Sequence, residues 1–156
     1  HKEVGFNYRL TNIQAAIGCA QVENAKMLVE ARRNIGLRYN VLLNGTKGLI
    51  LPKEKPEMKN VYWMYAVVLD ESVKLLRDEV KEKLKEKGIE TRSFFIPMHQ
   101  QPAYLNKTVE NAPDCSGDYP VSDRIGLRGF YLPSSSNLSE EEMKYVCTSL
   151  KEILKD

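Results

Sequence analysis

Gly5-Phe6-Asn7-Tyr8-Arg9-Leu10-Thr11-Asn12-Ile13-Gln14 is the stretch from which the fold of this chain is best interpreted. Thr11 and Gln14 have the spacing of a capping box, in which each side chain accepts a hydrogen bond from the other residue's backbone N–H. Apolar residues recur at helical spacing after this box, which predicts one long helix over 11–43, preceded by a loop over 4–10. The residues of the apolar stripe are Ile13, Ala16, Ile17, Ala20, Met27, Leu28, Ala31, Ile35 and Leu42.

Shorter elements follow this helix. Runs rich in β-branched and aromatic residues predict strands, and apolar residues at helical spacing predict further helices. The sum is an α+β domain with a small, mainly antiparallel sheet covered by helices on one side. The predicted strands are 61–69, 89–96 and 129–133, and the predicted helices run from Asp70 or Ser72 to Lys87, over 119–127, and from the capping box at Ser139 to the end of the chain, with a short helix near 103–105.

Composition excludes several classes of protein. The 156 residues carry 23 Lys and Arg against 21 Asp and Glu, a net charge of +2, whereas a nucleic-acid binder needs a local basic excess. The Lys-rich helix expected over 72–87 also contains acids, so its charged face is interpreted as solvated. No stretch approaches the roughly 18 consecutive apolar residues of a membrane span. We therefore expect neither a nucleic acid nor a membrane as partner.

Cysteine and histidine are too sparse for a metal or disulfide framework. The three cysteines are widely scattered without a Cys-x-x-Cys pair, and His1 and His99 are the only histidines, so no metal site is predicted. No signal peptide precedes the domain, which makes the cytoplasm the expected compartment. The chain starts at His1 inside a patterned segment rather than at Met, and we expect it to be part of a longer protein.

The loop over 4–10 has the chemistry of an anion site. Asn7 supplies an amide donor, Tyr8 a phenol and Arg9 a guanidinium, and such groups together suit a phosphate. The alternative on residue types alone is that Asn7 makes a turn and that Arg9 pairs with a surface acid.

A second candidate segment runs over 91–104. It combines adjacent aromatic residues, Phe94 and Phe95, with His99 and two prolines, and rigid mixed loops of this kind often line ligand sites. Histidine has an unperturbed pKa near ~6.5, so His99 can act as donor, acceptor or acid. The alternative is that one of the two phenylalanines is core and that His99 bonds a carbonyl.

These two segments resemble a known family. The run over 5–18, with Gln21, is similar to the signature of the DegT/DnrJ/EryC1/StrS sugar aminotransferases, which are pyridoxal-phosphate enzymes of fold type I. The run over 94–102 is similar to the corresponding segment of that family's GDP-perosamine synthase branch, although Ser93 stands where that branch is expected to have proline. The resemblance implies that 1–156 is the C-terminal small domain of such an enzyme.

The resemblance also implies roles for individual residues. Asn7 would reach across a homodimer to the cofactor phosphate of the neighbouring subunit. Tyr8 and Arg9 would face the cofactor or the sugar nucleotide. Phe95 and His99 would wall the substrate pocket.

The family's Schiff-base lysine and the large cofactor-binding domain would lie upstream of His1, so no catalytic lysine is expected here; Lys2, Lys53 and Lys107 do not match it. The full-length protein would use pyridoxal 5'-phosphate to transfer an amino group, with L-glutamate as the expected donor, to a 4-keto sugar nucleotide such as GDP-4-keto-6-deoxymannose. The isolated chain would be inactive and would not retain the cofactor. The alternative is a non-catalytic domain that self-associates through exposed apolar surface.

Overall fold

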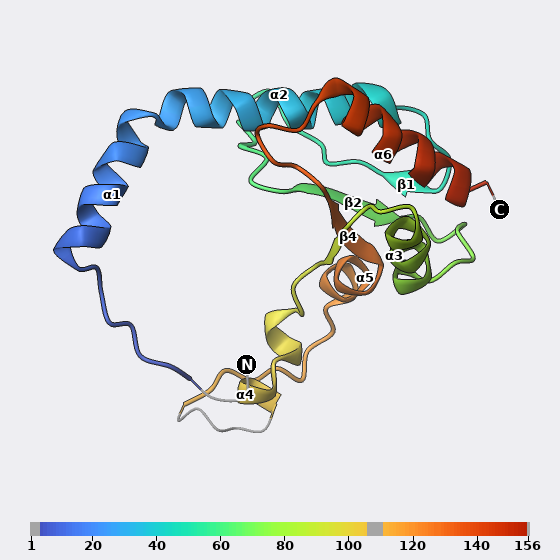
Figure 1. Ribbon diagram of the computed structural model, residues 1–156. Coiled ribbons are helices and arrows are strands. Elements are labelled where there is room, and N and C mark those ends of the chain that lie inside the picture. Colours follow the sequence, from blue (N-terminus) through green and yellow to red (C-terminus); the bar gives the residue numbers. More distant parts are fainter. Residues whose placement is uncertain (1–3, 106–110, 156) are drawn as a thin grey trace.

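The computed structural model describes residues 4–105 and 111–155 (Figure 1). Lys2 and Lys107, two of the lysines that do not match the catalytic one, lie outside these residues. The order of elements along the chain is α1 (Asn12–Glu23), α2 (Ala25–Leu43), β1 (Leu49–Ile50), β2 (Tyr65–Leu69), α3 (Arg77–Glu86), β3 (Arg92–Ser93), the 3₁₀ helix η1 (Met98–Gln100), α4 (Pro102–Leu105), α5 (Pro120–Arg128), β4 (Gly129–Leu132) and α6 (Glu140–Ile153).

The four strands form one antiparallel sheet in the order β1-β2-β4-β3. In the central pair, Tyr65 lies opposite Leu132 and Val67 lies opposite Phe130. These four side chains are buried, and because successive side chains of a strand point to opposite faces they share one face of the sheet. The predicted small antiparallel sheet is therefore confirmed, and one of its faces forms the floor of the core.

Three helices cover that face. Tyr39 of α2, Leu84 of α3 and Leu150 of α6 are fully buried in the same cluster as the strand residues, and Figure 1 shows α2 and α6 side by side above the sheet. Tyr39 also donates its hydroxyl to the carbonyl of Pro133 at 2.8 Å, so its one buried polar atom is satisfied. The opposite sheet face, which carries Ala66, Val68 and Tyr131, is only partly buried.

The prediction of a single helix over 11–43 is wrong in one respect. The structure has two helices there, α1 and α2, which are separated at Asn24. The Asn24 side chain donates to the carbonyl of Ala20 at 2.9 Å, and a side-chain bond of this kind competes with the backbone ladder. The capping box is present: Thr11 N–H donates to Gln14 Oε1 at 2.8 Å, and Gln14 N–H donates to Thr11 Oγ1 at 3.3 Å. The bend turns α1 away from the sheet (Figure 1), and none of its residues is buried.

Two other predicted boundaries also shift. The strand predicted over 61–69 begins only at Tyr65, because Tyr62 has a left-handed φ of 47° and its N–H donates to Asn60 Oδ1. The helix predicted from Asp70 or Ser72 begins at Arg77, because Asp70 instead accepts from Ser72 N–H in a local turn.

The remaining strand predicted over 89–96 is reduced to Arg92–Ser93. The short helix near 103–105, the helix near 119–127, the strand near 129–133 and the Ser139 capping box are confirmed. Within the described residues, no helix combines the length and the apolar character needed to cross a membrane.

Candidate functional site

Residues 4–10 form an extended arm in front of α1, and every residue of this arm is exposed. Inside the arm, Arg9 N–H donates to Asn7 Oδ1 at 3.0 Å, and Arg9 has a left-handed φ of 67°. A non-glycine residue in this region is strained by roughly 1–3 kcal/mol, and such strain is concentrated at functional sites. The turn at Asn7, which the alternative reading predicted, is thus present.

The chemistry of the arm fits a phosphate. Because Oδ1 of Asn7 is engaged by Arg9, its Nδ2 remains as a donor, and the described part of the chain offers it no acceptor. The Tyr8 side chain is 90% exposed. Arg9 forms no ion pair with the carboxylates that the structure describes, so the alternative pairing with a surface acid is not seen among them. The side chains of Asn7, Tyr8 and Arg9 are therefore three different donors on an exposed segment. This arrangement suits an anion that is bound to another part of the protein or to a partner subunit.

His99 lies on η1 and is held by a partner that the sequence did not predict. Its Nε2 lies 2.7 Å from Oδ1 of Asp123 on α5, and Gln100 Nε2 donates to the same oxygen at 2.6 Å. The ring stacks on Tyr119 with centroids 4.3 Å apart. His99 is 15% exposed, so the imidazole is fixed in position yet still reachable. Among the described residues His99 contacts this carboxylate, and the bond to a carbonyl that the alternative predicted is not seen.

Prolines at the ends of these short elements bring η1 and α5 together. Pro97 precedes η1, and Pro120 is the first residue of α5, where proline's fixed φ suits a helix start. Gly126 of α5 packs so closely on Pro97 that an added Cβ would lie 2.9 Å from the proline ring. This close contact sets Asp123 opposite His99. The sequence showed Asp123 only as one acid on a short amphipathic helix, with no signal that linked it to His99.

The two adjacent phenylalanines point in different directions. Phe94 is half-buried and stacks on Tyr131 of β4 at 4.6 Å, on the less covered sheet face, whereas Phe95 is 61% exposed. The Phe95 ring is nearly parallel to that of Trp63, with centroids 6.5 Å apart and planes 6° apart. Phe95 is therefore available to a ligand, as the sequence suggested, and Trp63 is a neighbour that it did not single out.

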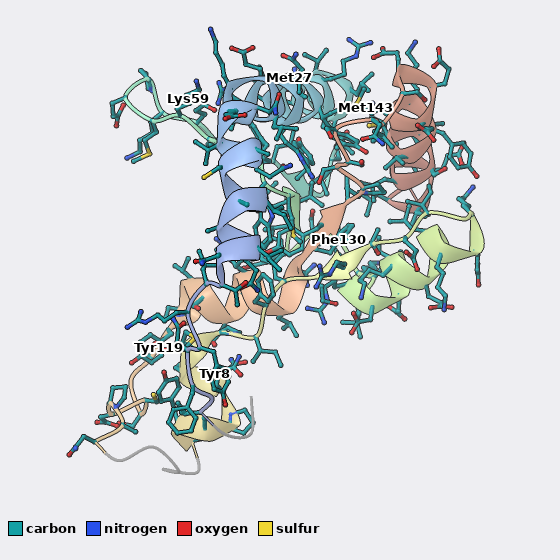
Figure 2. The ribbon with its side chains drawn as sticks, turned by 60° about the vertical axis from the view of Figure 1, so that its left-hand side comes forward. Tyr8, Met27, Lys59, Tyr119, Phe130 and Met143 are labelled. Carbon is teal, nitrogen blue, oxygen red and sulfur yellow. The ribbon has the colours of Figure 1, made fainter. Side chains whose placement is uncertain are left out.

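The arm and the His99 cluster lie at the same end of the molecule. Figures 1 and 2 both show the arm returning toward α4, and Figure 2 places Tyr8 near Tyr119, the residue on which His99 stacks. No hydrogen bond or ion pair joins Asn7, Tyr8 or Arg9 to Phe95 or His99 within the part of the chain that is described. The candidate site therefore has two halves, the arm and the His99 cluster, which lie near each other without a direct bond among the described residues.

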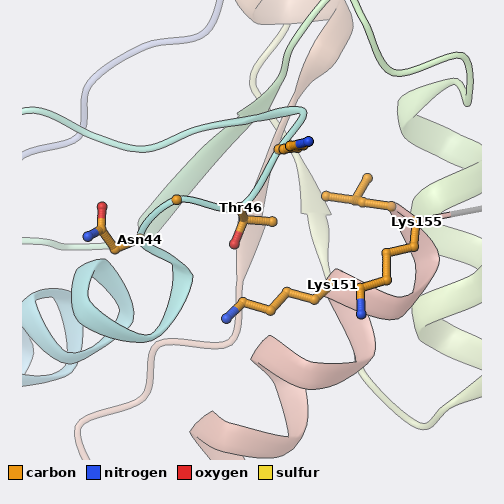
Figure 3. A pocket seen from close by; sticks show the side chains of 7 residues that line it. Asn44, Thr46, Lys151 and Lys155 are labelled. Carbon is orange, nitrogen blue, oxygen red and sulfur yellow. The ribbon is translucent and has the colours of Figure 1, made fainter.

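Other features lie away from this region. A cavity of about 490 Å³ is lined by the turn after α2 and the last turn of α6, including Thr46, Lys151 and Lys155 (Figure 3). None of the five site residues predicted from the sequence lines it. Among the described residues, no group of three or more His, Cys, Asp or Glu side chains could hold a metal ion.

Comparison with known proteins matches this chain to aminotransferases. The family model described as "DegT/DnrJ/EryC1/StrS aminotransferase family" matches residues 1–151. GDP-perosamine synthase of Escherichia coli O157:H7 is 35% identical over 156 residues, which is all of this chain and 40% of that protein. EpsN of Bacillus subtilis, named provisionally as a pyridoxal phosphate-dependent aminotransferase, is 34% identical over 142 residues, or 91% of this chain and 35% of that protein.

The fold agrees with that of a solved structure. The crystal structure of DesV from S. venezuelae superposes with a TM-score of 0.81 at 25% identity, covering all of this chain and 40% of that one. The chain thus spans about 40% of the length of the first curated relatives that it matches.

Proposed function

Because the chain belongs to the DegT/DnrJ/EryC1/StrS aminotransferase family, we propose that it is the C-terminal part of a pyridoxal phosphate-dependent enzyme that transfers an amino group to a sugar nucleotide. The large domain with the Schiff-base lysine would precede His1. In this proposal the present chain supplies the phosphate-binding arm and one wall of the substrate pocket.

The observation that carries the proposal is the exposed arm with an unused Asn7 amide. An arm whose Phe6 is 87% exposed and whose Asn7 Nδ2 lacks an acceptor in the described residues is incomplete by itself. The helix that follows the arm also exposes apolar side chains, since Ile13 and Ile17 of α1 are 76% and 60% exposed. Apolar surface of this extent marks an interaction site. A homodimer whose active sites are shared between subunits would cover it and would bring the Asn7 amide to the cofactor phosphate of the partner.

Each predicted side chain then has a role in binding. Asn7 would donate to a phosphate oxygen, and Arg9 would add a guanidinium that can form paired bonds to an anion. Tyr8 would face the cofactor or the sugar. When bound, pyridoxal phosphate supplies the electron-withdrawing ring that transamination requires.

The other half of the site would hold the substrate. Asp123 would fix the orientation of the His99 ring, so that its second nitrogen can exchange a hydrogen bond or a proton with the substrate. Phe95 would exclude water from that side of the pocket. GDP-4-keto-6-deoxymannose is the proposed acceptor, since the first relatives are GDP-perosamine synthases, and L-glutamate is the proposed amino donor.

The non-catalytic alternative gains no support from the first three curated relatives, because all three are named GDP-perosamine synthase. The self-association that it predicted is retained here as the proposed dimer. Nothing favours nucleic acid either: on α3, Lys81 lies 3.7 Å from Asp78 and Lys85 lies 3.6 Å from Glu82, so these lysines are paired with acids.

The test compares this chain with the full-length protein. Both are incubated with pyridoxal phosphate, L-glutamate and GDP-4-keto-6-deoxymannose, and formation of the amino sugar and 2-oxoglutarate is measured. We expect turnover by the full-length protein only. Turnover by the 156-residue chain would contradict the location of the lysine, and no transamination of any 4-keto sugar nucleotide by the full-length protein would contradict the function.

A further inference from the structure

Trp63 is the largest side chain near the candidate site with no role so far. It is the only tryptophan of the sequence, and it is 63% exposed, while its neighbour Tyr62 is 2% exposed. An indole left in water forgoes the stabilisation that burial of a large apolar side chain provides. An exposed tryptophan beside an exposed phenylalanine therefore suggests a surface kept open for a ligand.

The backbone around Trp63 is firmly held. Tyr62 adopts the left-handed φ of 47° and fits against Gly36 of α2, where an added Cβ would lie 2.4 Å from the Tyr62 ring. The Tyr62 hydroxyl accepts from Asn40 Nδ2 at 3.1 Å. The carbonyl of Trp63 accepts from Arg32 Nη1 at 3.3 Å. With the preceding ring anchored inside the core, the Trp63 side chain is directed outward from a fixed position, so that little ordering is needed when a ligand binds.

The rings of Trp63 and Phe95 are parallel and close together. Their planes differ by 6° with centroids 6.5 Å apart, whereas the core pair Tyr39 and Tyr65 is closer, at 4.7 Å, and tilted by 26°. Trp63 and Phe95 are each about 60% exposed, so both side chains can be reached by a ligand. Two parallel exposed rings are the arrangement on which a planar heterocycle stacks, as nucleic-acid bases do on aromatic side chains.

The charges beside this pair favour an anionic ligand. Arg32, which contacts the Trp63 carbonyl, forms no ion pair with a carboxylate of the described residues. The same holds for Arg92, which is paired in register with Tyr131, whose ring lies 6.3 Å from that of Phe95. A planar base next to a diphosphate complements two parallel rings flanked by two guanidinium groups that form no ion pair among the described residues, although Arg32 Nη1 also donates to the carbonyls of Trp63 and Ser134.

We propose that Trp63 and Phe95 form the binding platform for the base of the nucleotide half of the substrate, by stacking. This inference rests on the proposed function, because the nucleotide is the one attached to the sugar. It adds Trp63 as a binding residue and gives Phe95 a defined contact, with the base rather than the sugar.

The test is a binding experiment on the full-length protein by isothermal titration calorimetry. GDP is compared with inorganic pyrophosphate, which has the anionic groups but no base. The variants are Trp63→Leu, Phe95→Leu and the conservative Trp63→Phe, with Tyr145→Leu as a control, since Tyr145 is an aromatic residue of α6 that is also 53% exposed. We expect the two leucine variants to weaken GDP binding about tenfold and to leave pyrophosphate binding unchanged. Trp63→Phe should retain most of the affinity, and the control all of it.

GDP affinity in both leucine variants within twofold of the wild type would overturn the platform, and so would an equal loss of GDP and pyrophosphate binding. A wild-type protein that binds GDP, UDP and dTDP no more tightly than pyrophosphate would overturn it as well. Turnover measured in parallel separates the two proposals. An enzyme that is active while both variants bind like wild type contradicts only the platform, and a protein without transaminase activity whose variants lose base-dependent binding contradicts only the function.

Discussion

The Nε2 atom of His99 lies 2.7 Å from Oδ1 of Asp123, although the two residues belong to different short helices, η1 and α5. The contact decides which ring nitrogen is free. With Nε2 directed at a carboxylate, Nδ1 is the nitrogen left for a ligand, and the carboxylate stabilises the ring in this orientation. Asp123 is in this sense a positioning residue for His99.

Replacing Asp123 with asparagine tests this role. The Asp123→Asn variant of the full-length protein should lose about tenfold in kcat/KM, because the neutral amide holds the His99 ring in its orientation less firmly than the carboxylate does. Asp118→Asn is the matched control, since Asp118 is an exposed acid on the same segment. Wild-type kcat/KM in Asp123→Asn would contradict the role.

Replacing Asn7 with alanine tests the phosphate-binding arm. A hydrogen bond to a charged group contributes about 1.5–3 kcal/mol, so Asn7→Ala should weaken retention of pyridoxal phosphate by the full-length protein roughly 10- to 100-fold. Dialysis followed by absorbance of the bound cofactor measures this. Asn34→Ala, at an exposed position of α2, serves as the control. Equal cofactor affinity in Asn7→Ala and wild type would show that the arm does not hold the phosphate.

Replacing Gly36 with alanine tests the packing that positions Trp63. A Cβ at Gly36 would lie 2.4 Å from Cγ of the buried Tyr62 ring, and overpacking of this kind destabilises by about 1–3 kcal/mol. Urea unfolding of Gly36→Ala should show this loss. Gly18→Ala is the contrasting variant: nothing lies within 4 Å of its added Cβ, and alanine is the better helix former by roughly 1 kcal/mol. A Gly36→Ala protein as stable as Gly18→Ala would contradict the described packing.

The buried thiol of Cys147 predicts a loss of stability at alkaline pH. Burial raises the pKa of Cys147 from 9.0 to about 11, so the folded state binds a proton that the unfolded state releases first. The stability is complete below the unfolded pKa and is lost as the pH rises from about 9 to 11. Thermal unfolding at several pH values should show this decline. It should be smaller in Cys147→Val and unchanged in Cys19→Ala, whose thiol is exposed. An equal decline in Cys147→Val and wild type would contradict the assignment to this thiol.

Local signals in the sequence located most element ends correctly. The capping boxes at Thr11 and Ser139 are present in the structure, and Gly45 and Gly88 end their helices with left-handed φ values of 70° and 76°. These signals succeed because the partners of each bond lie within a few residues of one another. The apolar stripe over 11–43 predicted one continuous helix, but it did not show which part is buried. The first half of the stripe is exposed, and only residues from Ile35 onward reach the core. Periodicity shows that a face is apolar but not which surface covers it.

The residues of the candidate site also fall into two groups, those found from the sequence and those found only from the structure. Asn7, Tyr8, Arg9, Phe95 and His99 were singled out by residue type and by resemblance, and their assigned roles remain predictions. Asp123 and Trp63 were not singled out, since they are 24 and 32 residues away from His99 and Phe95 and no local spacing connects them. Only the close packing of α5 on Pro97 and the anchoring of Tyr62 bring them to those partners.

The sequence by itself determined the family, the α+β class and the helix ends that capping boxes and glycines mark, because these depend on short motifs and on hydrophobic periodicity. The tertiary structure alone decided that α1 and the arm leave the core, that Phe94 packs on Tyr131 while Phe95 is exposed, and that an acid from α5 holds His99. The physical reason is that a short motif fixes bonds between near neighbours along the chain, whereas burial and long-range pairing depend on which surfaces meet after the chain has folded.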